Sequence, residues 1–433
     1  MRAYDIIYKK RTSCELSKEE IDFMIEGFCR GDVPDYQMSA LAMAICFNGM
    51  TPRESFYLTD AMMRSGDTVD LSRFDGLCVD KHSTGGVGDK TTLVIAPIVA
   101  SLGARVAKMS GRGLGFTGGT VDKLEALTGY RTELSGEEFL LQVERVGIAV
   151  TGQSGNLVPA DKKLYALRDV TATIESIPLI ASSIMSKKLA SGAHSIVLDV
   201  KCGNGAFMKD EADALALAKA MIEIGEQFGR KVCALITDMS APLGRFIGNS
   251  LEVYEAILVL NGMGDARLTE LCVELASNMI SLSLGLSLDN ARQRVLEAIS
   301  SGDALKKMKE WILAQGGDIA LIDEPSRLLC APFKCALKAQ RGGYVSKIEA
   351  QEVGISSSLL GAGREKKGDE IDSLAGIELC VGVGDRVSAG DTIAFLYTSR
   401  QELFDSAMSR LESAIEISDS APQITPLIKY TLR

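Results

Sequence analysis

Histidine is scarce in this sequence, with two residues among 433, and none of its ten cysteines forms a C-x-x-C pair. Zinc sites usually take their ligands from these two residue types at close spacing, so the sequence does not favour one. The cysteines nearest to each other in sequence are Cys330 and Cys335. The irregular spacing of all ten is typical of reduced thiols in a cytoplasmic protein.

Positive charge and long apolar runs are also in short supply. The 47 lysines and arginines are outnumbered by 57 aspartates and glutamates, which gives a net charge of −10. A nucleic-acid-binding surface needs a basic face, and the longest apolar run, near Leu93–Ala100, is too short to cross a bilayer. The polar start, Met1–Asp5, has no secretory pattern. We therefore expect a cytoplasmic protein that binds neither nucleic acid nor membrane.

The rest of the sequence is that of an ordinary globular protein, 46% hydrophobic and 24% charged, with a length that predicts two or three domains. Residues up to 65 have helical periodicity and two capping-box patterns, Ser17–Glu20 and Thr51–Glu54. From residue 77 onward strands alternate with helices, which predicts a parallel α/β sheet. The strands are expected at Leu77–Val79, Ala104–Lys108, Gly147–Val150, Ile196–Val200 and Val232–Thr237.

The fold class predicted from these patterns is α/β with a small all-helical domain, a large α/β domain with a parallel or mixed sheet, and a C-terminal α+β part. A further helical segment interrupts the α/β pattern and is assigned to the helical domain. The C-terminal part includes a carrier-like hairpin at Gly382–Asp391, without the Met-Lys-Met tip that lipoyl and biotinyl carriers modify. The predicted domains are 1–65 plus 161–192 (helical), 77–155 plus 193–329 (α/β) and 330–433 (α+β).

Two strand–loop–helix units carry glycine-rich loops, Lys81–Lys90 and Ser110–Thr120. Glycines let a backbone approach an oxyanion closely, and unpaired N–H groups at a helix start point toward it. Tight turns of a sheet would explain the glycines alone. The lysines and hydroxyl residues at the strand ends favour phosphate instead, because a dianion requires such partners. They are Lys81, Ser83, Lys108, Ser110 and Thr120.

Two other nucleotide-binding motifs fit less well. The first loop is not a Walker A motif, because Asp89 separates Gly88 from Lys90. The second matches the G-x-G-x-x-G dinucleotide fingerprint, but the acidic residues about 20 positions later, at Glu137–Glu138, begin a helix where the fingerprint needs a strand end. His82 follows a lysine at a strand end, where α/β sheets bind ligands, whereas His194 is interpreted as structural.

A third group of residues lies in the helical segment of 161–192. Tyr165 and Arg168 are three apart, and Ser183 and Lys187 are four apart, so each pair shares a helix face. A solvated basic face would also explain them, and the flanking Lys162, Lys163 and Lys188 fit that interpretation. Arginine and lysine directed at one cleft could instead hold a planar, acceptor-rich group that becomes negative during a reaction.

Five stretches resemble the pyrimidine-nucleoside phosphorylases and thymidine phosphorylases, and the resemblance covers essentially the whole chain. They are Lys81–Asp89, Ser110–Glu125, Pro159–Thr173, Ser176–Lys188 and Asp199–Met208. The resemblance implies a homodimer in pyrimidine salvage that takes a pyrimidine nucleoside and inorganic phosphate as co-substrates and needs no organic cofactor. The implied reaction gives free base and pentose 1-phosphate.

The resemblance also implies the roles of individual residues. Arg168 and Lys187 would stabilise the departing base, and His82 would hydrogen-bond it or donate a proton. Linkers 66–76 and 152–160 would let the base and phosphate sites close on each other. The implied base site is Tyr165, Arg168, Ser183 and Lys187. The implied phosphate site is Lys81, His82, Ser83, Thr92, Lys108, Met109, Ser110 and Thr120.

Two positions depart from the family pattern. Phe116 stands where the family usually has histidine, and we expect the loss of a polar contact near the active site. Lys90 stands where the family often has threonine beside a potassium ion, and we expect its ammonium to replace that ion and pair with Glu255. The potassium position falls at Gly88, Leu243, Phe246 and Glu255.

Several functions stay open on the sequence alone. A phosphorylase that accepts uridine, deoxyuridine and thymidine is favoured, weakly, by Lys108 and Thr92 over a thymidine phosphorylase restricted to 2′-deoxynucleosides. A nucleotide phosphorylase or a relative of anthranilate phosphoribosyltransferase is disfavoured by Arg168 and Lys187. A non-catalytic paralogue that binds nucleoside or phosphate is supported only by Phe116 and Lys90.

Overall fold

The computed structural model describes the 433-residue chain apart from five positions: Leu114, Thr117, Ser154, Glu365 and Lys367. Leu114 and Thr117 belong to the second glycine-rich loop, and Ser154 belongs to the predicted linker 152–160. Predictions for these three residues therefore lie outside the described part of the chain.

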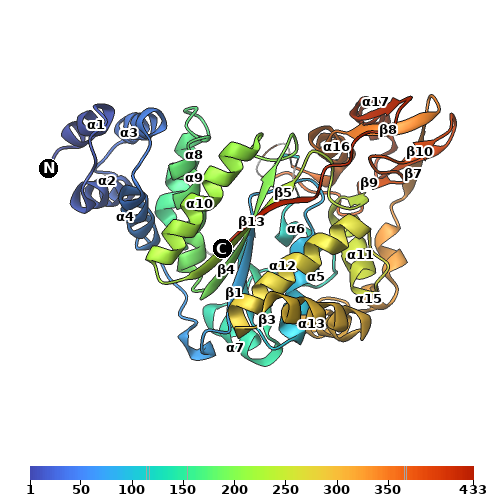
Figure 1. The fold of residues 1–433 in the computed structure, drawn as a ribbon, viewed down its shortest axis with the longest axis horizontal. Helices are drawn as coiled ribbons and strands as arrows, with labels where there is room; N and C mark the ends of the chain where they lie inside the picture. Colours follow the sequence, from blue (N-terminus) through green and yellow to red (C-terminus); the bar gives the residue numbers. More distant parts are fainter. Residues whose placement is uncertain (114, 117, 154, 365, 367) are drawn as a thin grey trace.

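The first residues form a helical bundle that also takes in a later segment. Capping boxes begin α2 at Ser17 and α4 at Thr51, which confirms both predicted helix starts. One hydrophobic core joins these helices to Leu164 and Leu179 of the later segment, and the two groups lie together in Figure 1. The bundle consists of α1 (Ala3–Arg11), α2 (Lys18–Arg30), α3 (Asp35–Asn48), α4 (Pro52–Met63), α8 (Pro159–Arg168) and α9 (Ile177–Ala190).

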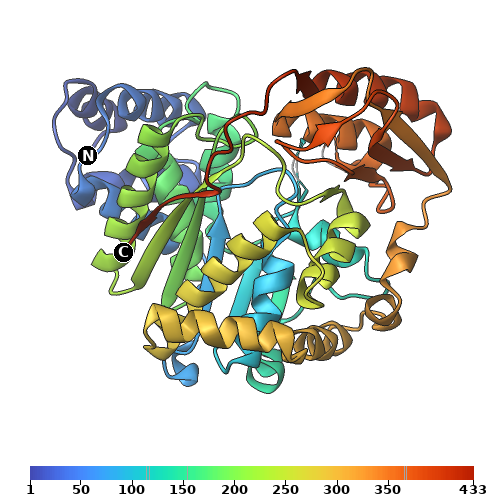
Figure 2. The same ribbon diagram turned by 45° about the vertical axis from the view of Figure 1, so that its right-hand side comes forward.

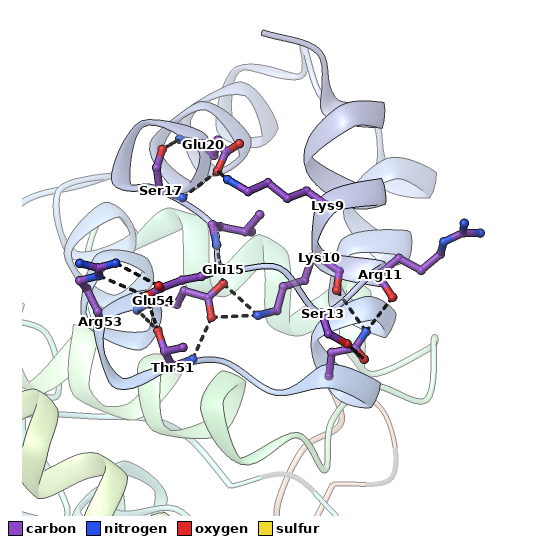
Figure 3. Close-up of polar contacts among 12 residues, drawn as sticks. Lys9, Lys10, Arg11, Ser13, Glu15, Ser17, Glu20, Thr51, Arg53 and Glu54 are labelled. Atoms are coloured by element: carbon purple, nitrogen blue, oxygen red, sulfur yellow. Dashed lines mark hydrogen bonds and ion pairs between the residues drawn. The ribbon is translucent and has the colours of Figure 1, made fainter.

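The carboxylate of Glu54 ties together the start of the bundle (Figure 3). It accepts hydrogen bonds from the Lys10 ammonium at 2.8 and 2.9 Å and from the backbone N–H groups of Leu16 and Thr51, each at 2.8 Å. Both Lys10 and Glu54 are buried. This pair is therefore a fully partnered ion pair inside the bundle.

The central sheet is parallel except at one edge. Hydrogen bonds order its strands β1-β4-β5-β13, and a parallel bridge between Cys78 and Arg105 places the β2-β3 pair beside β1. The first strand begins and ends later than predicted, so Lys81, His82 and Ser83 extend the strand rather than start the loop. The strands are β1 (Val79–Ser83), β2 (Val106–Ser110), β3 (Ile148–Gly152), β4 (Ser195–Cys202), β5 (Lys231–Asp238) and β13 (Ile428–Leu432).

Helices cover both faces of this sheet because its strands alternate their side chains. In β4, Ile196 and Leu198 pack in one core with residues of α9 and α10, whereas Val197 packs in another with residues of α5 and α12. Figure 2 shows the strands between the green helices and the yellow α12. The helices of the α/β part are α5 (Thr91–Ser101), α6 (Thr120–Glu125), α7 (Gly136–Val146), α10 (Glu211–Gln227), α11 (Asn249–Leu260), α12 (Ala266–Leu284), α13 (Leu288–Ser300), α14 (Asp303–Ala314) and α15 (Ala320–Asp323). Two short helical turns, η1 (Ser72–Phe74) and η2 (Pro325–Leu329), belong to it as well.

Among the described helices, none by itself combines the length and apolar composition of a membrane span, and α12 with α13 would do so only as a pair bent by 120°.

The C-terminal part has two small antiparallel sheets, ordered β6-β9-β11-β7 and β10-β8-β12. Strand β6 comes from the α/β region, so it connects the two parts. Residues 428–432, which the predicted boundary places in this part, instead pair with β5 in the central sheet (Figure 1). The elements are β6 (Phe246–Ile247), β7 (Phe333–Lys338), β8 (Gly343–Ile348), α16 (Ala350–Ser357), η3 (Ser358–Ala362), β9 (Gly376–Leu379), β10 (Arg386–Val387), β11 (Thr392–Thr398), η4 (Gln401–Leu403), α17 (Phe404–Ala414) and β12 (Ile415–Ser418).

Candidate active site

The two glycine-rich loops leave neighbouring strands at the same edge of the sheet. The Val79 N–H donates to the Arg105 carbonyl, and the Arg105 N–H donates to the Leu77 carbonyl, each at 2.9 Å. Strands β1 and β2 therefore lie side by side and parallel. Their loops open at the carboxyl ends of the strands, where open α/β sheets bind ligands.

A cavity of about 230 Å³ lies between these loops. All eight residues of the predicted phosphate site line it, together with glycines of both loops. Two further lysines, Lys187 and Lys188, reach it from α9. The predicted phosphate residues at its wall are Lys81, His82, Ser83, Thr92, Lys108, Met109, Ser110 and Thr120.

The carboxylate of Asp80 holds two of the lysines at this cavity. Its Oδ2 accepts from the Lys188 ammonium at 2.6 Å and its Oδ1 from the Lys108 ammonium at 3.1 Å. Burial raises the pKa of Asp80, but the charges of Lys108 and Lys188 more than offset it and lower that pKa to about 2. Asp80 thus stays ionised and fixes both ammonium groups beside the cavity.

Lys108 carries a perturbed charge. Burial lowers its pKa, Asp80 partly opposes that effect, and the positive charges of Lys188 and Lys81 lower it further, to about 8. The ammonium also donates to the Lys81 carbonyl oxygen. Lys108 is therefore cationic at neutral pH and loses its charge in mildly alkaline solution.

Lys81 is held by a hydroxyl group and two carboxylates. Its ammonium donates to the Thr91 hydroxyl at 2.5 Å and lies 3.3 Å from Asp199 and 3.5 Å from Asp89. Burial lowers the pKa of Lys81, but Asp89 and Asp199 outweigh it and raise that pKa. This lysine therefore remains charged.

The second loop is closed on itself by acidic residues of α6. Asp122 accepts the Gly113 N–H at 2.6 Å, and Glu125 receives the Arg112 guanidinium through two bonds of 2.6 Å. Gly119 is needed at this closure, because a Cβ there would come 2.2 Å from the Gly113 nitrogen. These contacts hold Arg112 and Gly113 against α6 beside the cavity.

A second cavity of about 210 Å³ adjoins the first and shares His82, Ser83, Gly85 and Lys187 with it. The predicted base site, Tyr165, Arg168, Ser183 and Lys187, lines this cavity. Apolar side chains complete the wall: Ile174, Ile180, Ile184, Phe207 and Leu217. Such a slot suits a flat heterocycle with a few polar atoms.

Arg168 is buried, and three of its N–H groups bind backbone carbonyls of the loop after α8 and of α9. Its guanidinium donates to the carbonyl oxygens of Thr173 at 3.0 Å, Ile174 at 2.7 Å and Leu179 at 3.2 Å. Burial lowers its pKa. A guanidinium has five N–H donors, so these bonds leave about two for a ligand. Arg168 therefore shapes the cavity wall as well as lining it.

Lys187 is directed by a neighbouring carboxylate. Its ammonium donates to Asp161 Oδ2 at 2.6 Å and to the Ser183 hydroxyl at 3.1 Å. The second contact places Ser183 and Lys187 on one helix face, as their spacing predicts. The ammonium therefore stands at the junction of the two cavities with a fixed orientation.

His82 lies at the same junction and is neutral at physiological pH. Burial is the largest cause of its pKa falling well below the usual value, followed by the positive charges of Lys188 and Lys108. A neutral imidazole donates a hydrogen bond from one nitrogen and accepts at the other. Hydrogen bonding to a base is thus favoured over donation of a proton.

Helix α11 supplies two buried carboxylates, each paired with a lysine at the end of a glycine-rich loop or just after it. Glu252 lies 2.7 Å from Lys123 of α6, and Glu255 lies 2.5 Å from Lys90, which precedes α5. Phe116 is absent from the described residues lining the two cavities. Its carbonyl oxygen instead lies close to Gly354 of α16, because a Cβ added to Gly354 would come 2.7 Å from that oxygen. We therefore place Phe116 at the contact with the C-terminal part.

Sequence reasoning missed three residues of the site: Asp80, Asp161 and Lys188. Lys188 fitted a solvated face, but it is only 5% exposed because it pairs with Asp80. Asp161 carried one usable signal, an acidic residue in the first turn of the helix with Tyr165. Asp80 carried none beyond its place in a strand, since its partners lie 28 and 108 positions away.

Comparison of the fold and sequence first defines the class of protein. Residues 4–66 match a glycosyl transferase family helical bundle domain, and residues 75–305 match a glycosyl transferase family α/β domain. The crystal structure of anthranilate phosphoribosyltransferase from Thermus thermophilus superposes with a TM-score of 0.59 at 19% identity, covering 72% of this chain and 99% of that one. That likeness shows the shared fold.

The closer matches define the family. Residues 344–418 match a pyrimidine nucleoside phosphorylase C-terminal domain. The chain is 55% identical over 429 residues to a pyrimidine-nucleoside phosphorylase of Geobacillus stearothermophilus, covering 99% of each. It is 54% identical over 433 residues to that of Bacillus subtilis (strain 168), covering 100% of this chain and 99% of the other. The chain therefore belongs to the pyrimidine-nucleoside phosphorylase family, which are pentosyltransferases.

Proposed function

We propose that the protein catalyses reversible phosphorolysis of uridine, deoxyuridine and thymidine to the free base and ribose or deoxyribose 1-phosphate. The observation that carries this proposal is the pair of adjoining cavities. One is lined by lysines and glycines and the other by apolar side chains with Arg168, and His82 and Lys187 lie at the wall they share. A nucleoside bound across that wall would present its anomeric carbon to phosphate.

In the proposed reaction an oxygen of phosphate forms a bond to the anomeric carbon while the bond from that carbon to the base nitrogen breaks. The bonding electron pair stays on the base, which leaves as an anion and is then protonated. Lys187, held by Asp161, stabilises that negative charge, and Arg168 contributes through its remaining N–H donors. Neutral His82 donates a hydrogen bond to a carbonyl oxygen of the base.

A preorganised donor of this kind contributes about 10²–10³ in turnover. We expect Lys187→Ala to lower kcat by that factor while phosphate still binds, as measured by steady-state kinetics and by phosphate titration. Arg168→Ala would lower kcat as well, and it would also loosen the loop that holds Thr173. Unchanged turnover in both variants would remove these residues from the mechanism.

Closure of the helical domain on the α/β domain is part of this proposal. The two predicted linkers touch: the Asp67 N–H donates to the Asn156 carbonyl at 3.0 Å, and a Cβ on Gly66 would come 2.0 Å from that oxygen. Val158 has a φ of 49°, which is costly for a β-branched residue. Strain at this point is consistent with a hinge. Small-angle scattering should show compaction when both substrates are added, and no change would contradict closure.

The decisive assay follows base release by ultraviolet absorbance. Uridine, deoxyuridine and thymidine are each incubated with and without phosphate. We expect phosphate-dependent release of base from all three. Turnover of the two deoxynucleosides alone would favour a thymidine phosphorylase, and no turnover of any would favour a non-catalytic binding protein.

We also propose that the protein works as a homodimer in the cytoplasm and without an organic cofactor. The helical bundle exposes large side chains, with Tyr36 at 73% and Phe47 at 82% exposure. Tyr4 and Tyr8 of α1 are exposed as well, and such a surface suits a self-complementary interface. Sedimentation of the wild-type protein and of Phe47→Glu would test this, with dissociation expected in the variant.

A further inference from the structure

Lys90 ends the first glycine-rich loop, and its ammonium is buried in a small cage of oxygen atoms. It donates to the carbonyl oxygens of Leu243 at 2.9 Å and Phe246 at 2.7 Å, and to the Glu255 carboxylate at 2.5 Å. An ammonium has three donors and no acceptor, so the cage matches it fully. The Lys90 side chain is 0% exposed and that of Glu255 is 2% exposed.

The cage is built in advance by close backbone packing. Gly88 and Gly244 both have a φ of 76°, which favours glycine. A Cβ on Gly88 would come 2.4 Å from the Leu243 carbonyl oxygen, and one on Gly244 would come 2.4 Å from the Glu255 carboxylate. Glu255 also accepts the Arg245 N–H at 2.7 Å. The oxygens therefore have little freedom to move apart.

Main-chain carbonyl and carboxylate oxygens converging on one point are the ligands of a hard cation. The family resemblance assigns a potassium ion to these positions. In this chain the residues do not fit that ion, because the Lys90 ammonium already takes the cage oxygens and a second positive charge beside it would be repelled.

We propose that Lys90 is a covalently tethered cation that replaces a bound monovalent ion, so that this protein is independent of potassium. The ammonium joins the loop at the phosphate cavity to the segment that leads into β6, and β6 pairs with β9 of the C-terminal part. Because the cation is part of the chain, its effective concentration does not depend on the medium. Removing the side chain should leave a cage that binds potassium.

The first experiment uses the wild-type protein alone. Thermal melting and uridine phosphorolysis are measured in potassium, sodium and choline chloride at equal ionic strength, so that general screening is the same in all three. We expect kcat/KM to differ by less than about twofold among the salts, because the cage takes no cation from the medium and screening is the same in all three. Strong activation by potassium, or a melting temperature raised by potassium over choline, would overturn the proposal.

The second experiment uses Lys90→Thr and Lys90→Met. In choline we expect Lys90→Thr to lose at least about tenfold in kcat/KM, because the Glu255 carboxylate is left buried without its charge partner. Potassium should restore most of that loss and raise the melting temperature by roughly 2–4 °C. Lys90→Met should not respond, because its side chain fills the cage without charge.

The matched control is Lys10→Thr in the helical bundle, which removes another buried ammonium from a glutamate. The Lys10 ammonium donates to the Glu54 carboxylate and, among the described residues, to no other oxygen (Figure 3). We therefore expect destabilisation without rescue by potassium. Equal responses of Lys90→Thr and Lys10→Thr to potassium would contradict a cation cage. The melting readout stands whether or not the proposed reaction is correct.

Discussion

The titration of Lys108 provides a sharp test of the proposed phosphate site. Its pKa of about 8 makes it an ammonium at neutral pH that is lost as the pH rises. A dianion binds the charged form, so kcat/KM for phosphate should decline above about pH 8. That parameter reports ionisations of the free enzyme, which is the state for which this pKa applies.

Asp80→Asn changes this titration in a defined direction. The carboxylate raises the pKa of Lys108 through a contact of 3.1 Å. Two unit charges at this distance interact by about 5 kcal/mol at an effective dielectric constant of about 20, whereas shifts caused by one opposite charge are about 1–3 units because other groups respond. We therefore expect the decline to move from about pH 8 to about pH 5–7.

Lys108→Arg is the companion variant, because a guanidinium stays charged throughout the range. Its kcat/KM for phosphate should be lower but should show no alkaline decline. Initial rates of uridine phosphorolysis at subsaturating phosphate are measured for both proteins from pH 6 to about pH 9. Ionisation of the substrates is common to both, so the ratio of the Lys108→Arg rate to the wild-type rate should rise above about pH 8. A ratio that does not change with pH would refute the assignment.

Three further experiments test other parts of the structure. Asp161→Asn leaves Lys187 without its charged partner, and the loss of a charged hydrogen bond of about 1.5–3 kcal/mol predicts a fall in kcat of about 10–100-fold; steady-state kinetics giving an unchanged kcat would exclude this orienting role. Gly119→Ala should abolish phosphate binding in a calorimetric titration, whereas Gly111→Ala, with open space around its Cβ, should retain it; equal affinities would show that the close approach is not required. The pKa of Asp80 falls on folding from 3.8 to about 2. Its contribution to the free energy of unfolding, about 2 kcal/mol, is therefore present above about pH 4 and is lost as the pH falls toward 2. In urea unfolding, Asp80→Asn should lose less stability than wild type between these pH values, and identical losses would contradict the linkage.

Local features of the chain were predictable because they depend on neighbours in sequence. Ser17 and Thr51 cap helices through residues three positions away, and Ser183 reaches Lys187 across one helical turn. The glycine-rich loops were also recognisable, because glycines, lysines and hydroxyl residues cluster there within short stretches. The predicted end of β1 was wrong by four residues, since pairing with β4 continues the strand from Val79 through Ser83.

The resemblance implied one distant contact, between Lys90 and Glu255, and the structure confirms it. Other contacts between distant residues were beyond sequence reasoning. The prediction placed residues 428–432 in the C-terminal α+β part, yet backbone pairing with β5 makes them a strand of the central sheet. Lys188 was interpreted as part of a solvated basic face, yet its ammonium donates to Asp80 of β1. Arg168 was expected to contact the ligand directly, yet carbonyl oxygens of Thr173, Ile174 and Leu179 take much of its hydrogen-bonding capacity.

The sequence by itself determined the helix starts, the alternation of strands and helices, the two glycine-rich loops and, through its motifs, the family. Tertiary structure decided which charged side chains lie close together and which titratable side chains are neutral. The physical reason is that a pKa or an ion pair depends on burial and on distances between side chains far apart in the chain. Burial and the lysines folded around it lower the pKa of His82, and Lys188 meets Asp80 across 108 positions of sequence.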